Sequence, residues 1–321
     1  MRRHALGQTS LEVSQIGFGC VKLTTHENRR DAVQALETAF ASGITHFDVA
    51  RAYGFGRAEG ILGDFLQGKR DRVTVATKFG IQPPSGIAGS RWAIDLAKKA
   101  LGPFPGLLRR ARQRGSEMVQ SGMFTPTIMI ESLETSLREL RTDYVDLLLL
   151  HEATLAEAAS EPLLDALQKQ VARGTVRVLG VASAFSKLRK DLNKVPTEYS
   201  VLQFDDNAHT RNLERVENMD RALITHSIFQ PAESLRSAIA ANAELARRVS
   251  REVGADVKEP SVIGSLLLHY ALQNNPNGLV LFSSSNPQHI SANAVDAMSS
   301  RYDKQQVDGF ANFVRTAFGP S

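Results

Sequence analysis

Cysteine is almost absent from this sequence: Cys20 is the single thiol among 321 residues. One thiol cannot form an internal disulfide, and it cannot supply the several thiolates of a cysteine-based zinc or iron–sulfur site. A chain of this length buries enough apolar surface to fold without either device. We therefore expect a cytoplasmic protein whose functional site holds no metal.

Long hydrophobic runs are missing as well. No uninterrupted apolar stretch approaches the roughly 18 residues of a membrane-spanning helix. The first ten residues are basic, but no apolar core of a secretion signal follows them. The sequence therefore predicts no membrane partner and no export.

Aromatic residues make up only 7% of the chain. This matters because a positively charged chain that binds nucleic acid often needs aromatic residues beside its basic ones. The charge is +4, from 38 basic and 34 acidic residues, and its densest basic stretch is 109–114. A groove for single-stranded nucleic acid interleaves such cations with aromatic stacking platforms, and only Phe104 lies near this stretch. We expect a solvated surface segment and no nucleic-acid partner.

The sequence does contain a regular alternation of short β-branched segments and helical patterns. Eight segments have the pattern of strands: 15–19, 45–48, 73–78, 144–150, 176–182, 201–205, 222–227 and 279–283. Eight strand–helix units in a chain of this length are typical of a (β/α)8 TIM barrel. We predict this α/β fold as a single domain over residues 1–321.

Three further features refine this prediction. Residues 6–11 have the pattern of a small N-terminal hairpin that closes the bottom of the barrel. Thr125-Pro126 and Asn286-Pro287 each combine an N-cap residue with proline at the first helical position. The Gly/Pro-rich stretch 80–124 predicts a long loop at the C-terminal face. A doubly wound sheet is the alternative, but residues 17–22 lack the third glycine of its fingerprint.

Polar residues follow the predicted strands where TIM barrels place their chemistry. Asp48, Lys78 and His151 end strands, and Tyr53 lies in the loop after Asp48. Singly, each has an ordinary explanation as a cap, an ion pair or a rim side chain. Together they can make the phenol a proton donor. A neighbouring ammonium lowers the pKa of a phenol from about 10, and a carboxylate holds that ammonium in place. A neutral imidazole beside them donates a hydrogen bond to a carbonyl oxygen. This set predicts protonation of a carbonyl oxygen while a cofactor delivers hydride.

Several segments in order resemble the aldo-keto reductases over nearly the whole chain. They are residues 6–14, 47–54 with Glu59 following, 77–78, 144–151 and 180–181. The resemblance implies a catalytic tetrad of Asp48, Tyr53, Lys78 and His151, with Tyr53 as general acid. It also implies an NAD(P)(H)-dependent oxidoreductase that interconverts an aldehyde, ketone or sugar carbonyl and an alcohol.

The same resemblance implies the residues that hold the nicotinamide cofactor. They are Gly19, Cys20, Ser183, Gln203, Ser227, Ser283, Ser284, His289 and Asn293. NADP-using relatives carry a lysine and an arginine where Ser283 and His289 stand. The cofactor is therefore NADP(H) or NAD(H), because a 2′-phosphate favours a cationic partner. Trp92, in the long loop, is expected to line the substrate pocket, with ordinary loop packing as the alternative.

Two other classes of protein could use the same barrel. A nucleotide-sensing binding subunit would use the same scaffold with little turnover. A metal-dependent hydrolase on the same barrel is disfavoured, because the eight histidines include no His-x-His pair. The physiological substrate, the direction of the reaction and the choice between monomer and homo-oligomer stay open.

Overall fold

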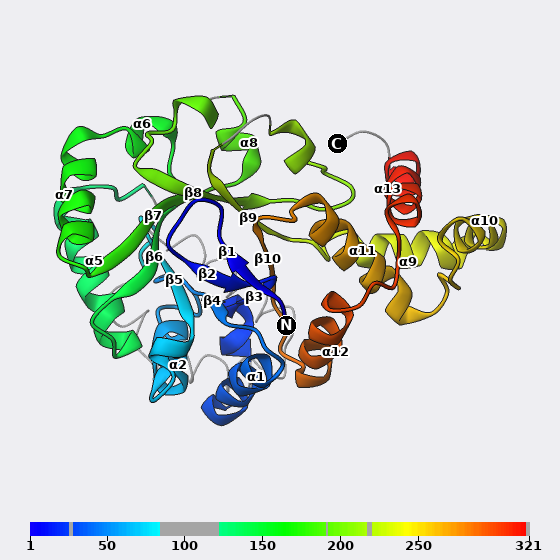
Figure 1. Cartoon of the computed structure of the whole chain (residues 1–321), viewed down its shortest axis with the longest axis horizontal. Helices are drawn as coiled ribbons and strands as arrows, with labels where there is room; N and C mark the ends of the chain where they lie inside the picture. The colour runs from blue at the N-terminus through cyan, green and yellow to red at the C-terminus, as the bar shows by residue number, and fades with distance from the viewer. Residues whose placement is uncertain (26–27, 84–121, 191, 217–219, 319–321) are drawn as a thin grey trace, which may run out of the picture.

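The computed structural model describes residues 1–25, 28–83, 122–190, 192–216 and 220–318. Within these ranges eight parallel strands pair in chain order around a closed barrel (Figure 1). The barrel strands are β3 (Ile16–Gly19), β4 (His46–Asp48), β5 (Thr74–Phe79), β6 (Val145–His151), β7 (Val176–Ala182), β8 (Tyr199–Asp205), β9 (Ala222–His226) and β10 (Leu279–Phe282). This confirms the predicted (β/α)8 TIM barrel.

Helices surround the barrel, as Figure 1 shows. The α-helices are α1 (Arg29–Ala41), α2 (Ala58–Leu66), α5 (Pro126–Leu140), α6 (Leu155–Ala158), α7 (Glu161–Ala172), α8 (Phe185–Leu188), α9 (Ala232–Ala241), α10 (Ala243–Val253), α11 (Pro260–Asn274), α12 (Pro287–Ala297) and α13 (Lys304–Phe318). Four short 3-10 turns complete the described elements: η1 (Cys20–Thr25), η2 (Arg70–Arg72), η4 (Leu192–Lys194) and η5 (Leu213–Arg215). In the described part of the chain, none of the helices has the length and apolar character to cross a membrane.

The helix starts follow the predicted capping chemistry. Thr125 accepts a hydrogen bond from the backbone N–H of Ile128 at the start of α5, and Asn286 does the same for Gln288 at the start of α12. Residues 232–253 form two helices, α9 and α10, although helical spacing continues across Asn242. The side chain of Asn242 caps α10 instead of continuing the backbone ladder.

An N-terminal hairpin closes the bottom of the barrel, as expected. Its strands β1 (Arg3–Ala5) and β2 (Glu12–Ser14) pair antiparallel, and Figure 1 shows the hairpin, in dark blue, across the middle of the ring of strands. Leu6, Leu11 and Val13 are buried in one cluster with the inward-facing barrel residues. The apolar filling leaves the other end, where the strands finish, for the functional site.

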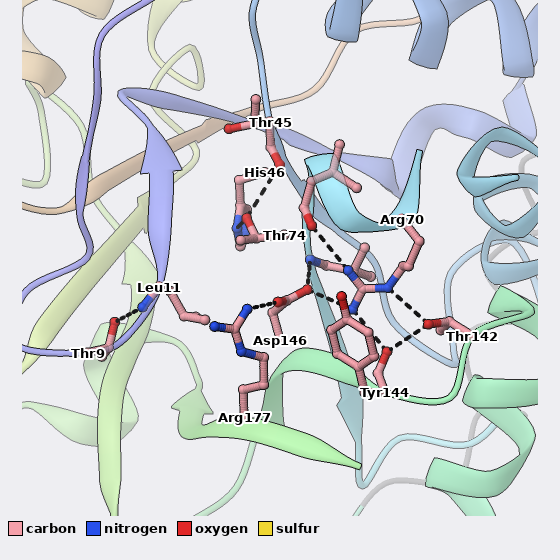
Figure 2. Close-up of polar contacts among 12 residues, drawn as sticks. Thr9, Leu11, Thr45, His46, Arg70, Thr74, Thr142, Tyr144, Asp146 and Arg177 are labelled. Carbon is pink, nitrogen blue, oxygen red and sulfur yellow. Dashed lines mark hydrogen bonds and ion pairs between the residues drawn. The ribbon is translucent and has the colours of Figure 1, made fainter. Parts of the chain in front are cut away.

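A buried ion pair fixes the strands near their N-terminal ends (Figure 2). Asp146, near the start of β6, is 1% exposed and lies 2.7 Å from Arg70 and 2.8 Å from Arg177. It also accepts a hydrogen bond of 2.8 Å from the backbone N–H of Val75 on β5. One carboxylate therefore ties β5, β6 and β7 together at the end opposite the C-terminal rim.

Candidate active site

A cavity of about 460 Å³ opens at the C-terminal ends of the strands. Its volume lies within the range of roughly 300–1,000 Å³ that small-molecule sites occupy. Predicted site residues from all eight barrel strands, or from the residues just after them, line it: Gly19, Asp48, Tyr53, Lys78, His151, Ser183, Gln203, Ser227 and Ser283. The structure therefore brings together residues that are as far as 264 positions apart in the sequence (Gly19 to Ser283).

Lys78 and Asp48 form a buried ion pair at the base of this cavity. Each side chain is 2% exposed, and the ammonium of Lys78 donates a hydrogen bond to Asp48 Oδ1. The ammonium also donates to the carbonyl of Val49 at 3.2 Å and to the phenolic oxygen of Tyr53 at 3.4 Å. Burial alone would lower the pKa of Lys78, but Asp48 and Tyr53 raise it above its ordinary value. Lys78 is therefore a fixed positive charge.

Tyr53 faces the cavity from the loop between β4 and α2. Burial raises the pKa of its phenol more than the nearby charge of Lys78 lowers it, so the pKa lies above its ordinary value of 10.0. Lys78 does lower this pKa, as expected, but desolvation of the phenolate outweighs the Coulombic attraction, so the net shift is upward. At neutral pH the phenol keeps its proton.

His151 ends β6 beside Tyr53. The two ring centroids are 5.9 Å apart and the ring planes meet at 82°. Burial, together with the smaller effect of the charge of Lys78, lowers the pKa of His151 to about 3. Its Nδ1 atom is buried and has no hydrogen-bond partner among the described residues. His151 is therefore a neutral imidazole with a ring nitrogen still open to a ligand.

Amide and hydroxyl groups also line the cavity. Gln203 donates a hydrogen bond from Nε2 to Asp48 Oδ2 at 3.2 Å, while Ser183 donates to the carbonyl of Ala153 at 2.9 Å. The Oε1 atom of Gln203 and the Oγ atom of Ser283 are buried without a partner in the described part of the chain. Unpaired buried polar atoms are costly, so these two oxygens are candidates for hydrogen bonds from a bound polar group. A carboxamide N–H fits the free oxygen of Gln203.

Four of the predicted cofactor residues do not line this cavity. Cys20 is fully buried in the core, where burial raises the pKa of its thiol well above the ordinary value. Its side chain turns inward at the start of η1 and lies 3.8 Å from the carbonyl oxygen of Phe18. Ser284 hydrogen-bonds with the backbone of Asn286 ahead of α12. His289 is exposed on α12, and Asn293 is partly exposed on the same helix.

Trp92 and the basic stretch 109–114 lie outside the described residues. Among the residues that are described, no three His, Cys, Asp or Glu side chains gather in a way that would hold a metal ion.

Sequence reasoning missed His226, the last residue of β9. It lines the cavity, its Nδ1 atom lies 2.9 Å from Ser227 Oγ, and burial lowers the pKa of its imidazole. Ser227 itself has a left-handed backbone, with φ of 66°. The rule that pointed to Asp48 and His151, polar residues at strand ends, also points to His226.

Comparison with known families agrees with this architecture. The family model described as the aldo/keto reductase family matches residues 15–314. The chain belongs to this family, which confirms the resemblance seen in the sequence.

Curated relatives match over part of their length. An uncharacterised oxidoreductase of Bacillus subtilis (strain 168), YqkF, is 29% identical over 202 residues, which are 63% of this chain and 55% of the relative. A 6-dehydroglucose reductase of Agrobacterium fabrum is 32% identical over 214 residues, 63% of this chain and 57% of the relative. The chain thus spans little more than half the length of these relatives.

Solved structures share the fold over nearly the whole chain. The holo form of an aldo-keto reductase from Bacillus halodurans has a TM-score of 0.72 at 18% identity, covering 98% of this chain and 96% of that one. A glycerol dehydrogenase of Gluconobacter oxydans also has a TM-score of 0.72, at 17% identity, covering 99% and 96%. An aldo-keto reductase of Klebsiella pneumoniae in complex with NADPH has a TM-score of 0.65 at 20% identity, covering 100% and 97%.

Proposed function

We propose that this protein is an NAD(P)(H)-dependent oxidoreductase that interconverts a carbonyl compound and an alcohol. One observation carries the proposal: a protonated phenol, a fixed ammonium and a neutral imidazole meet in one cavity, with Lys78 Nζ 3.4 Å from Tyr53 and the His151 ring 5.9 Å from it. These groups can protonate an oxygen atom as negative charge develops on it.

The same cavity suits a nicotinamide cofactor. Gln203 and Ser183 would hold its carboxamide, and Ser227 and Ser283 line the path that continues along the barrel rim. When bound, the cofactor supplies or accepts a hydride. The choice between NADP(H) and NAD(H) depends on how the 2′-phosphate would be bound near Ser283 and α12. Positions 283 and 289 there carry serine and histidine, not lysine or arginine.

The chain's own groups have distinct tasks in carbonyl reduction. Tyr53 donates the phenolic proton to the carbonyl oxygen, and the charge of Lys78 stabilises the phenolate that remains. Asp48 keeps Lys78 charged and in place. His151 orients the carbonyl oxygen by hydrogen bonding from its neutral ring. For alcohol oxidation the proton returns to Tyr53 by the reverse path.

Substrates of this reaction are small aldehydes, ketones, sugars or the corresponding alcohols. Relatives named as a 6-dehydroglucose reductase and a pyridoxal 4-dehydrogenase support a polar substrate with a carbonyl or hydroxyl group. We further propose that the whole chain acts as one domain in the cytoplasm, since one cysteine suits a reducing compartment.

Substitution Tyr53→Phe tests the proposal, because it removes the acid and keeps the ring. We expect turnover to fall by about 100-fold or more, with cofactor affinity unchanged. Turnover is followed by cofactor absorbance, and affinity by fluorescence titration. Tyr144→Phe is the matched control: Tyr144 lies at the barrel bottom, with Arg70 3.8 Å above its ring, and its variant should keep wild-type turnover.

Two results would overturn this function. Wild-type rates in Tyr53→Phe would exclude Tyr53 as the acid. Tight cofactor binding by the wild-type protein without turnover on a broad panel of aldehydes, ketones and sugars would instead indicate a nucleotide-sensing binding subunit.

A further inference from the structure

A further buried ion pair lies behind the tetrad, and the proposed mechanism does not use it. Arg51 Nη1 pairs with Glu59 Oε2, and Thr77 donates a hydrogen bond of 2.6 Å to the other carboxylate oxygen of Glu59. The Glu59 side chain is fully buried and that of Arg51 is 10% exposed. None of the three residues lines the cavity.

The three residues belong to the segments that carry the proposed acid and its cation. Arg51 lies in the loop between Asp48 and Tyr53, and Thr77 directly precedes Lys78 on β5. Glu59 is in the first turn of α2. Because side chains alternate along a strand and Lys78 faces the cavity, Thr77 faces outward toward α2. The network therefore joins the Tyr53 loop to the Lys78 strand from the outer side of the barrel wall.

The loop that carries Tyr53 has a backbone that needs such support. Gly54, Phe55 and Gly56 all have positive φ, at 58°, 57° and 83°. Phe55 is not glycine, so its left-handed conformation is disfavoured and persists only where the surroundings hold it. Just after this turn the backbone N–H of Ala58 donates to the carbonyl of Tyr53 at 3.3 Å, linking the turn to α2.

Stability alone does not explain a buried ion pair at this position. Replacing a buried pair with apolar groups of similar volume is often neutral or stabilising, because desolvation offsets the attraction. An ion pair held between a loop, a helix and a strand does fix geometry, since several directional bonds must be satisfied together. We propose that Arg51 and Glu59, with Thr77, are positioning residues that set the phenol of Tyr53 at contact distance from Lys78.

This inference rests on the proposed function, and Glu59→Gln tests it. Glutamine keeps an acceptor for Thr77 and removes the charge that Arg51 needs. A displacement of about 1 Å in a reacting group can cost about 100-fold in rate, so we expect kcat to fall between about tenfold and 100-fold. KM for the cofactor should stay unchanged, because no residue of the network touches the cavity. Arg51→Met should behave in the same way, and Arg51→Lys should recover part of kcat.

Asp146→Asn is the matched control. Asp146 is as deeply buried, accepts from two arginines and also holds β5, but it does so at the opposite end of the barrel (Figure 2). Its variant should lose thermal stability and keep kcat. If Glu59→Gln and Arg51→Met lose only stability, as Asp146→Asn does, the positioning role is overturned, while inactivity of Tyr53→Phe would leave the function standing.

Crystal structures of the wild type and of the variants give a readout that needs no turnover. We expect the distance from Lys78 Nζ to the Tyr53 oxygen to increase beyond 3.4 Å in Glu59→Gln, and to stay at that value in Asp146→Asn. An unchanged distance in Glu59→Gln overturns the inference even where no substrate has been found. Should Glu59→Gln fail to fold, the same comparison is made with Arg51→Lys, which keeps the buried positive charge.

Discussion

The ammonium of Lys78 lies 3.4 Å from the phenolic oxygen of Tyr53 and also donates a hydrogen bond to the buried carboxylate of Asp48. These two contacts of Lys78 have one consequence for catalysis and one for stability. It stabilises the phenolate that forms when Tyr53 gives up its proton, and it leaves Asp48 dependent on one cation for its neutralisation.

Lys78→Met separates these two consequences. Without the ammonium the phenolate is not stabilised, so carbonyl reduction should slow by about 100-fold or more. Asp48 then remains buried without its cation, and the free energy of unfolding should fall by about 3 kcal/mol. The double variant with Asp48→Asn should recover most of that stability and none of the rate. Urea unfolding and initial rates measure the two effects, and a single variant with wild-type turnover would contradict this role of Lys78.

The pH dependence of turnover follows from two pKa values displaced in opposite directions. His151 has a pKa of about 3 and that of Tyr53 is raised above 10.0, so neither group titrates in the neutral range. Reduction needs the protonated phenol, and its rate should stay flat from about pH 5 to pH 9 and fall as the pH rises through the raised pKa of Tyr53. Alcohol oxidation needs the phenolate and should instead accelerate with pH. A limb near the ordinary histidine pKa of about 6.5 in the kcat profile would show that His151 is not held neutral.

Cofactor preference provides a third test. Ser283 lines the cavity and His289 is exposed on α12, so neither supplies a fixed cation for a 2′-phosphate. We expect the dissociation constants of NADPH and NADH to agree within about tenfold, and Ser283→Lys with His289→Arg to tighten NADPH by about tenfold or more. Fluorescence titrations with both cofactors measure this. A strong NADPH preference in the wild type would mean that other groups bind the phosphate.

The barrel could be predicted because its signals are local. The run of apolar residues in β6 is buried on both sides of a parallel sheet, and Thr125 and Asn286 mark helix starts by their own side-chain chemistry. The sequence does not mark the break at Asn242, because helical spacing continues across it. In the structure Asn242 has an extended backbone, and its side-chain oxygen accepts a hydrogen bond from the N–H of Leu245.

The sequence predicts which residues form the tetrad, but it does not predict their pKa values. Strand ends identify Asp48, Lys78 and His151 without any knowledge of packing. The pKa of Tyr53 depends on how deeply its ring is enclosed, and sequence spacing carries no measure of desolvation. The contact between Arg51 and Glu59 likewise exists only once α2 packs on the barrel wall.

A buried histidine inside the barrel gives a last prediction, on acid stability. His46 on β4 is fully buried, and its Nδ1 atom lies 2.9 Å from Thr74 Oγ1 while its Nε2 atom has no partner in the described residues. Burial lowers its pKa from 6.5 to about 4, although the negative charges of Asp48 and Asp146 oppose this shift. Between these two values the unfolded chain binds a proton that the folded chain does not.

Stability from His46 is therefore fully present above about pH 6.5 and is lost as the pH falls toward 4. A shift of this size corresponds to roughly 3 kcal/mol. His46 should remove about this much unfolding free energy between pH 7 and pH 4. His151 adds a loss of the same sign, whereas Asp206, whose pKa burial raises to about 6, opposes it. His46→Gln should reduce the loss, whatever its stability at pH 7, since no proton is taken up at position 46. Denaturant unfolding at both pH values measures the difference. His289→Gln, at an exposed site, should keep the wild-type loss, and an equal loss in His46→Gln would show that the buried imidazole does not govern acid stability.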